Sequence, residues 1–222
     1  MPATENNYEG KPFLSIIAGS FRQKVDPGTP GAKLREYELS DGSKGEKWEL
    51  SYPGWRGIVR ELRVVDTEYG DVLRVEFDDV ILSLSMDRSF ATDFLRKFAG
   101  ADVHTEIVVT PRDFINDEGK RVVRMSVVQC DENLKNSFCS YNPETKEWTY
   151  KEGFPVPDEK MSKDDWKIYY LSVKKYLKNW VILNPINTIG DRDDQVDRGE
   201  KVEEVEIPVI PEHKGRLDDI EF

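Results

Sequence analysis

Alternation of apolar and polar residues constrains this chain more than any other feature of its sequence. Leu73, Val75 and Phe77 fall on one side of an extended backbone, with charged residues between them. Two other segments continue the pattern, with apolar positions at Val80, Leu82, Leu84 and Met86 in the first and at Val123, Met125 and Val127 in the second. Because successive side chains of a strand point to opposite faces, the pattern predicts half-buried β-strands.

The period changes between these strands, at residues 88–100. Phe90, Phe94, Leu95 and Phe98 recur there at helical spacing, and a glycine follows as a stop signal. One short helix is therefore predicted among five strands, at 57–66, 71–79, 80–86, 102–110 and 121–129. Five short strands with a helix between the third and fourth is the element order of the OB-fold. The expected fold class is mainly β with α, an OB-fold-like Greek-key barrel.

Further elements flank the predicted barrel. Residues 11–21 have strand-like composition, and residues 33–39 and 46–52 are expected to pair as a hairpin around the turn-forming sequence SDGSKG. Residues 25–33 have the proline and glycine density of a flexible connection. Another hairpin is expected within residues 137–151.

An amphipathic helix is predicted after Ser162. Ser162 and Asp165 have the spacing of a capping box. One apolar stripe follows, made of Trp166, Tyr169, Tyr170, Val173, Tyr176, Leu177 and Trp180. Lys174, Lys175 and Lys178 are expected in the last turns, where positive charge suits the helix dipole. We interpret the stripe as the face that packs on the barrel.

The negative charge of the chain is concentrated at one end. The whole chain carries a net charge of −11, and residues 191–222 contain 12 acidic and 5 basic side chains, so that they carry −7 and residues 1–190 carry −4. Residues 191–222 have no aromatic residue before Phe222. They also have no helical or strand-like hydrophobic period long enough to form a buried face. We therefore expect a flexible N-terminus at 1–10, one domain at 11–186 and a disordered acidic tail at 187–222.

The sequence offers little for catalysis or metal binding. Cys130 and Cys139 lie nine positions apart without a CxxC pair, and the chain has two histidines, so no zinc site is expected. Residues 28–34 lack the spacing of a phosphate-binding loop, and residues 191–203 lack the glycine and glutamate of a calcium loop. We expect no enzyme, no cofactor and no metal. Free thiols and the absence of a signal-like or membrane-spanning segment indicate a cytoplasmic protein.

Aromatic and basic side chains interleave on several of the predicted strands. The candidate nucleic-acid-binding residues are Trp48, Tyr52, Trp55, Arg56, Arg60, Arg63, Tyr69, Arg74 and Arg124. Single-stranded nucleic acid is held by this combination, because aromatic rings stack on unpaired bases while cations contact phosphates. For Trp48 and Trp55 an equally good alternative is a role in the core or in a cross-strand pair.

The chain ends in RLDDIEF, and this end carries the clearest signal. Asp218 and Asp219 precede Ile220, and Phe222 bears the free carboxylate. The last five residues resemble the C-terminal tip of bacterial and phage single-stranded-DNA-binding proteins, whose usual ending is Asp-Asp-Ile-Pro-Phe. Four of the five residues match, with Glu221 in place of proline.

The resemblance implies a protein that binds and protects single-stranded DNA without sequence specificity. It also implies that Asp218, Asp219, Ile220 and Phe222 bind replication, recombination or repair proteins. The additional N-terminal hairpins and the helix at 162–180 depart from the compact bacterial form, which favours a phage-encoded or divergent member. Segregation of charge suggests that the tail competes with DNA for the basic face at low salt.

Two alternatives remain open at this point. The chain could be an OB-like structural or adaptor protein, for example a virion component, whose acidic tail binds only protein. The tail could also serve only to keep the protein in solution, since a high net charge opposes association.

Overall fold

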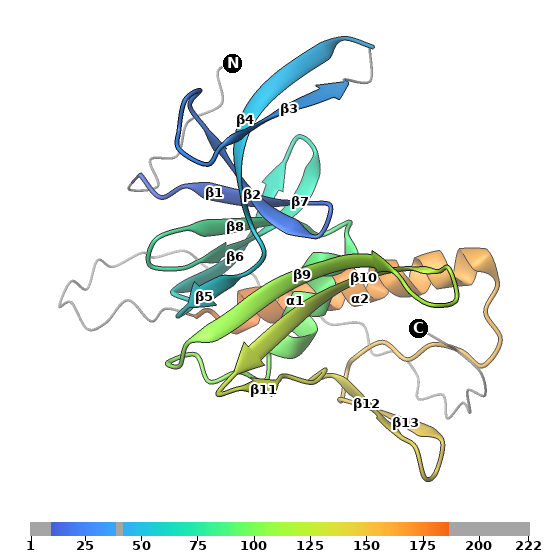
Figure 1. The fold of residues 1–222 in the computed structure, drawn as a ribbon. Coiled ribbons are helices and arrows are strands. Elements are labelled where there is room, and N and C mark those ends of the chain that lie inside the picture. Colours follow the sequence, from blue (N-terminus) through green and yellow to red (C-terminus); the bar gives the residue numbers. More distant parts are fainter. Residues whose placement is uncertain (1–9, 39–41, 187–222) are drawn as a thin grey trace.

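The fold is described by a computed structural model for residues 10–38 and 42–186, in which β-strands predominate and two helices pack against them (Figure 1). The expected class, mainly β with α, is therefore confirmed at this level. The predicted acidic tail and nearly all of the predicted flexible N-terminus lie outside the described residues.

One large sheet is built from the N-terminal half of the chain. Its strands are β1 (Phe13–Ile17), β2 (Ser20–Val25), β3 (Lys33–Glu38), β4 (Lys44–Tyr52), β6 (Glu61–Thr67), β7 (Gly70–Glu76) and β8 (Ile81–Ser85). They lie in the order β3-β4-β2-β1-β8-β7-β6. Only β1 and β8 pair in parallel within this sheet; its other neighbours are antiparallel. The predicted hairpin of residues 33–39 and 46–52 is confirmed as β3 and β4.

A tight turn divides the segment 11–21, for which the sequence indicated one strand-like run. Ala18 and Gly19 both have positive φ, 48° and 71°, as the two-residue turns of right-twisted hairpins require. A Cβ atom on Gly19 would lie 3.0 Å from the backbone nitrogen of Asp113. The turn thus packs closely against another strand, which favours glycine at this position.

A second sheet has the order β11-β10-β9-β5. Its strands are β5 (Trp55–Gly57), β9 (Ile107–Ile115), β10 (Arg121–Gln129) and β11 (Glu132–Asn133). Three residues separate β5 from β6, so the chain passes here from the second sheet into the first. β9 begins at Ile107 and not at residue 102, because the Asp102 carboxylate accepts hydrogen bonds from His104 N and Thr105 Oγ1 and holds a turn.

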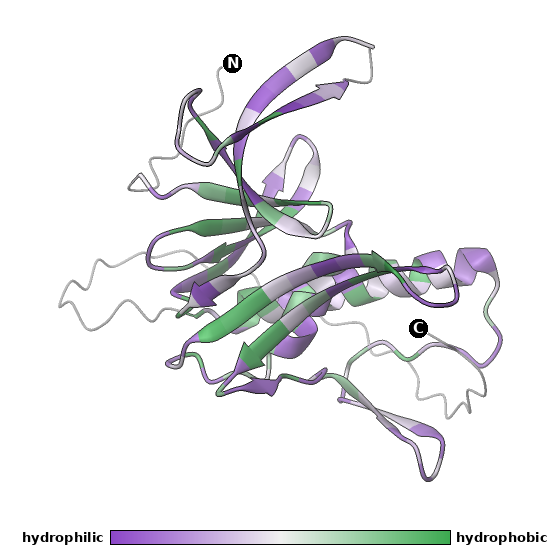
Figure 2. Cartoon of the chain, in the orientation of Figure 1, coloured by the Kyte–Doolittle hydropathy of each residue, from purple (hydrophilic) through white to green (hydrophobic). Residues whose placement is uncertain are grey.

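The core lies between the two sheets and the helices. Most of the alternating residues that predicted the strands are buried there, namely Leu73, Val75, Phe77, Val80, Leu82, Leu84, Met86, Met125 and Val127, whereas Val123 is only half-buried. Figure 2 shows this apolar character on β1, β8 and the first half of β9. Half-buried strands are therefore confirmed where the alternation is regular.

The predicted helix is confirmed as α1 (Ser89–Phe98), and its side chains contact β10. Phe94, Leu95 and Phe98 are buried in the core. On the opposite side of the helix, an Asp93 carboxylate oxygen accepts from Met125 N at 2.6 Å, and Lys97 Nζ donates to Met125 O. Two side chains of α1 thus satisfy the free backbone edge of β10 at this residue.

Helix α2 (Lys163–Leu183) begins with the predicted capping box of Ser162 and Asp165. It ends at Leu183, so Lys174 and Lys178 lie within the helix and not in its last turn, which corrects the expected role for the helix dipole. Lys178 instead pairs with Asp71 at 2.8 Å, and Lys174 pairs with Asp87 at 2.7 Å. The ammonium groups hold the pKa of Asp71 below its ordinary value, chiefly through the hydrogen bond from Lys178.

Candidate nucleic-acid interface

A cleft of about 1230 Å³ opens between α1, the beginning of β10, α2 and the hairpin of β12 (Cys139–Asn142) and β13 (Glu147–Tyr150). Its basic lining residues are Arg88, Arg96, Lys97, Lys120, Arg121, Arg124, Lys167 and Lys174. Its acidic lining residues are Asp87, Asp93 and Glu118. Eight cations against three carboxylates give this concave surface a positive charge, although the whole chain carries −11.

Two arginines of the cleft form no ion pair with a carboxylate of the described residues. Five other cations have an acidic partner, in the pairs Lys97–Asp93, Lys120–Glu118, Arg121–Asp113, Lys167–Asp164 and Lys174–Asp87. Within the described residues, the side chains of Arg88 and Arg96 have no such partner, and Arg96 Nε is buried without a hydrogen bond. The Arg96 guanidinium lies over the Phe154 ring, 5.8 Å from its centroid. In this part of the chain, no carboxylate therefore neutralises these two guanidinium groups.

Five aromatic side chains line the same cleft from two elements. Trp148 and Tyr150 come from β13, and Trp166, Tyr169 and Tyr170 come from α2. The Trp166 ring lies 5.6 Å from Tyr169 and 5.8 Å from Tyr170, centroid to centroid. Tyr170 is 51% exposed, so part of this aromatic surface faces solvent.

Two half-buried tyrosines of the cleft, Tyr150 and Tyr169, stay protonated at neutral pH. Burial raises the pKa of Tyr169 to about 12, even though the nearby positive charge of Arg96 acts in the opposite direction. Burial also raises the pKa of Tyr150. Since neither phenol ionises near pH 7, both rings remain neutral beside a bound polyanion.

Phe138 anchors the aromatic walls of the cleft to the rest of the fold. Its ring is 1% exposed, stacks on Phe154 at 5.4 Å and contacts Tyr176 and Trp180 of α2 edge to face, at 5.5 and 5.9 Å. The backbone N–H of Lys151 donates to Phe138 O, which ties the end of the hairpin to the same residue. This cluster therefore fixes β12–β13 relative to α2.

No protein-family model, curated protein or solved structure matches this chain. In residues 10–38 and 42–186, no group of three or more His, Cys, Asp or Glu side chains is placed to hold a metal ion. No helix of this part is long and apolar enough to cross a membrane.

Three aromatic residues proposed from the sequence lie along β4 and β5, away from the cleft. Trp48 on β4 is half-buried and pairs with Val25 and Leu34 across the strands. Tyr52 and Trp55 pack against the core and meet edge to face at 5.3 Å. Tyr52 and Trp55 thus have packing roles, and Trp48 lies in cross-strand pairs. These are the alternatives that the sequence left open for Trp48 and Trp55.

The proposed arginines of β5 to β7 lie near carboxylates or an aromatic ring. Arg60 donates two hydrogen bonds to Asp78, and Arg63 lies between Glu61 and Glu76. The guanidinium of Arg74 lies 5.4 Å from the Phe13 ring centroid. Two other proposed residues are mostly exposed to solvent. The Arg56 side chain is 68% exposed and lies 3.9 Å from Glu106. Tyr69 is 85% exposed at the turn between β6 and β7.

Arg124 is the one sequence-proposed residue in the described chain that lines the cleft. Asp218, Asp219, Ile220 and Phe222 lie outside the described residues. Sequence reasoning missed the cations of α1, because its helical pattern was read only for its apolar face. It also assigned the whole aromatic stripe of α2 to packing. Val173 and Leu177 are indeed buried, and Tyr169, Tyr176 and Trp180 pack against the core, whereas Trp166 and Tyr170 line the cleft without joining that cluster.

Proposed function

We propose that the protein binds and protects single-stranded DNA without sequence specificity, in the cleft between α1, β10, β12–β13 and α2. The observation that carries this proposal is the lining of the cleft, in which eight cations and five aromatic rings share one concave surface of an acidic chain. Stacking on an aromatic ring is worth about 1–3 kcal/mol per base and is tolerant of sequence. Phosphate contacts add affinity that is likewise independent of sequence.

The strand connectivity supports an extended OB-fold for this protein. The chain runs through β5 and β6, then through β7 and β8, and returns after α1 as β9 beside β5. A fourth strand that returns beside the first is the arrangement of a Greek key. β8 pairs in parallel with β1, so the N-terminal hairpin extends the sheet at this edge.

The C-terminal tip would recruit partners in replication, recombination or repair. A terminal phenylalanine fits an apolar pocket while its carboxylate and the Asp218–Asp219 pair meet basic side chains. This part of the proposal rests on the resemblance of the last five residues to the tip of single-stranded-DNA-binding proteins.

The first test compares labelled single-stranded and double-stranded oligonucleotides by gel shift at about 50 mM salt. We expect a preference for the single strand of about tenfold or more, because bases in a duplex cannot stack on the cleft aromatics. Affinity should fall steeply as salt is raised. Equal binding to both forms, or none, would reject this function in favour of a structural or adaptor protein.

Deletion of residues 191–222 is expected to tighten binding of single-stranded DNA at low salt. The deleted residues carry −7 and compete with phosphates for the same cations, so affinity should rise about threefold or more at about 50 mM salt. A chain lacking only Phe222 is the matched control, since it keeps the acidic spacer and should bind DNA as the full chain does. Equal or weaker affinity of the truncated protein would contradict competition by the tail.

A further inference from the structure

Two arginines face each other on the β9–β10 hairpin. Arg112 of β9 and Arg124 of β10 are directly opposite in the antiparallel register, and both are exposed. Like charges in this position destabilise a strand pair. In the described residues the Arg112 side chain has no hydrogen-bond or ion-pair partner. The hairpin therefore places two exposed guanidinium groups at opposite positions, where one anion can contact both.

The pair belongs to the face of the hairpin that is turned away from the core. Val109 and Met125 are fully buried on the other face, and side chains alternate along both strands. Figure 1 shows β9 and β10 in front of α1 and α2, so this outer face is not covered by either helix. Phe114, two residues from Arg112 on the same face, is 48% exposed.

The outer face is continuous with the cleft through one residue. Arg124 is among the residues that line the cleft, and it also stands opposite Arg112 on the outer face. A chain that leaves the cleft across the free edge of β10 meets these two guanidinium groups first. The exposed ring of Phe114 follows on the same surface.

We propose that Arg112 and Arg124 together bind a backbone phosphate of the DNA strand that leaves the cleft, and that Phe114 stacks on the next base. Two guanidinium groups at opposite positions of a strand pair suit a phosphate diester, whose oxygens accept charge-assisted hydrogen bonds. The second site rests on the proposed function and extends the path of the strand around the β10 edge.

The test replaces Arg112 in the full-length protein by alanine and, separately, by glutamate. For Arg112→Ala we expect about fivefold weaker binding of an oligonucleotide long enough to leave the cleft, and a slope of log affinity against log salt that is smaller by about 0.7. Arg112→Glu should weaken binding by about 30-fold or more, because it repels the phosphate and pairs with Arg124.

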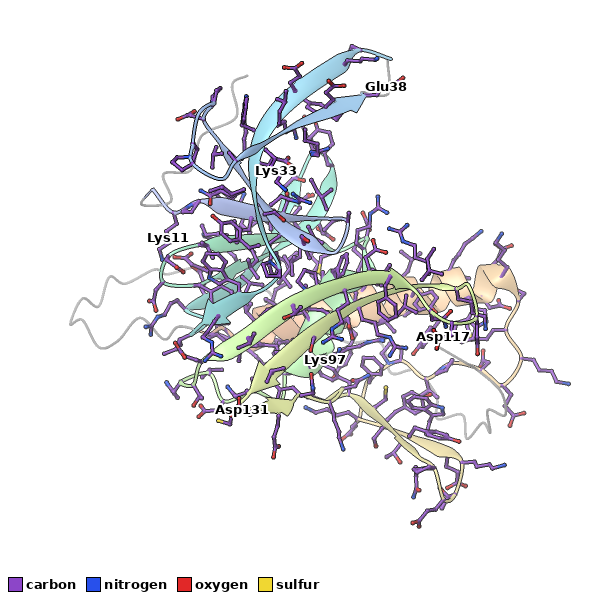
Figure 3. The ribbon with its side chains drawn as sticks, viewed as in Figure 1. Lys11, Lys33, Glu38, Lys97, Asp117 and Asp131 are labelled. Atoms are coloured by element: carbon purple, nitrogen blue, oxygen red, sulfur yellow. The ribbon has the colours of Figure 1, made fainter. Side chains whose placement is uncertain are left out.

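The midpoint of thermal unfolding distinguishes a phosphate-binding role of Arg112 from a structural role. Removal of a like-charge pair should leave the midpoint unchanged or raise it, and Arg112→Glu should raise it by about 1–3 °C. Lys33→Ala is the control for loss of one positive charge, since Lys33 lies on β3, well away from the tip of the β9–β10 hairpin marked by Asp117 (Figure 3). It should change affinity and salt slope little.

Phe114→Ala should lower affinity for the same long oligonucleotide, and Phe114→Tyr should restore it, because both aromatic rings stack on a base. If the native protein prefers single strands but both Arg112 variants bind as it does, the second site is wrong and the cleft proposal stands. Lower affinity accompanied by a lower thermal midpoint in Arg112→Ala would also count against the second site. If the native protein fails to bind single strands, the proposed function itself fails.

Discussion

Replacing Arg96 with glutamine is expected to weaken binding of single-stranded DNA by about tenfold, and replacing Arg88 in the same chain should bring the loss to about 100-fold. In the described residues both side chains lack an acidic partner, and Arg96 Nε is buried in the cleft without a hydrogen bond. A phosphate that reaches them therefore meets cations that no carboxylate has neutralised. Fluorescence anisotropy with a labelled oligonucleotide at fixed salt measures the change.

Arg96→Lys is the matched control, because it keeps the positive charge while replacing the guanidinium that lies over Phe154. It should retain most of the affinity, while losing the fork that bonds two phosphate oxygens. The optical titration of the tyrosines gives a second readout, since Arg96 lowers the pKa of Tyr169 and Arg96→Gln should raise it. Unchanged DNA affinity in the double variant would contradict binding in the cleft.

Replacing Phe138 with alanine is expected to cost about 3–5 kcal/mol of unfolding free energy, the range for truncating a buried aromatic residue. The ring contacts Phe154, Tyr176 and Trp180, so its loss opens a cavity where the β12–β13 hairpin meets α2. Urea unfolding followed by tryptophan fluorescence measures the effect. DNA affinity should fall as well, because Trp148 and Trp166 stand on the two walls that Phe138 joins.

Two further variants serve as controls for the predicted cost of Phe138→Ala. Phe138→Leu keeps most of the buried volume and should cost about 1–1.5 kcal/mol. Tyr141→Ala removes an aromatic ring that is 46% exposed on the same hairpin, and should cost less than about 1 kcal/mol. A cost below about 1 kcal/mol for Phe138→Ala would show that the hairpin and α2 are held together by other contacts.

The regular strands and both helices could be predicted because their signals are local. Leu73, Val75 and Phe77 alternate within a few residues, and Ser162 caps α2 through a partner three positions away. The start of β9 could not be predicted in the same way. Asp102 and Thr105 lie in a segment of acceptable strand composition, and a side-chain hydrogen bond between them decides in favour of a turn.

The residues of the candidate site could be predicted from the sequence less well than the fold. Arg96 occupies the polar side of a helix whose apolar side explained its pattern completely, so nothing local marked it as a binding residue. Trp55 and Arg60 looked like a binding pair because they are close in sequence. In the structure, Trp55 donates to Asp79 and Arg60 to Asp78, and these carboxylates are about 20 residues away along the chain.

The sequence by itself determined most of the strands and both helices, where the negative charge lies and what the last five residues resemble, because each of these depends on neighbouring residues. Only the tertiary structure decided which cations and aromatic rings share a surface. Arg96 on α1, Trp148 on β13 and Trp166 on α2 meet in one cleft because buried residues such as Phe138 hold their elements together. Proximity of that kind is set by packing between distant segments, and no local pattern encodes it.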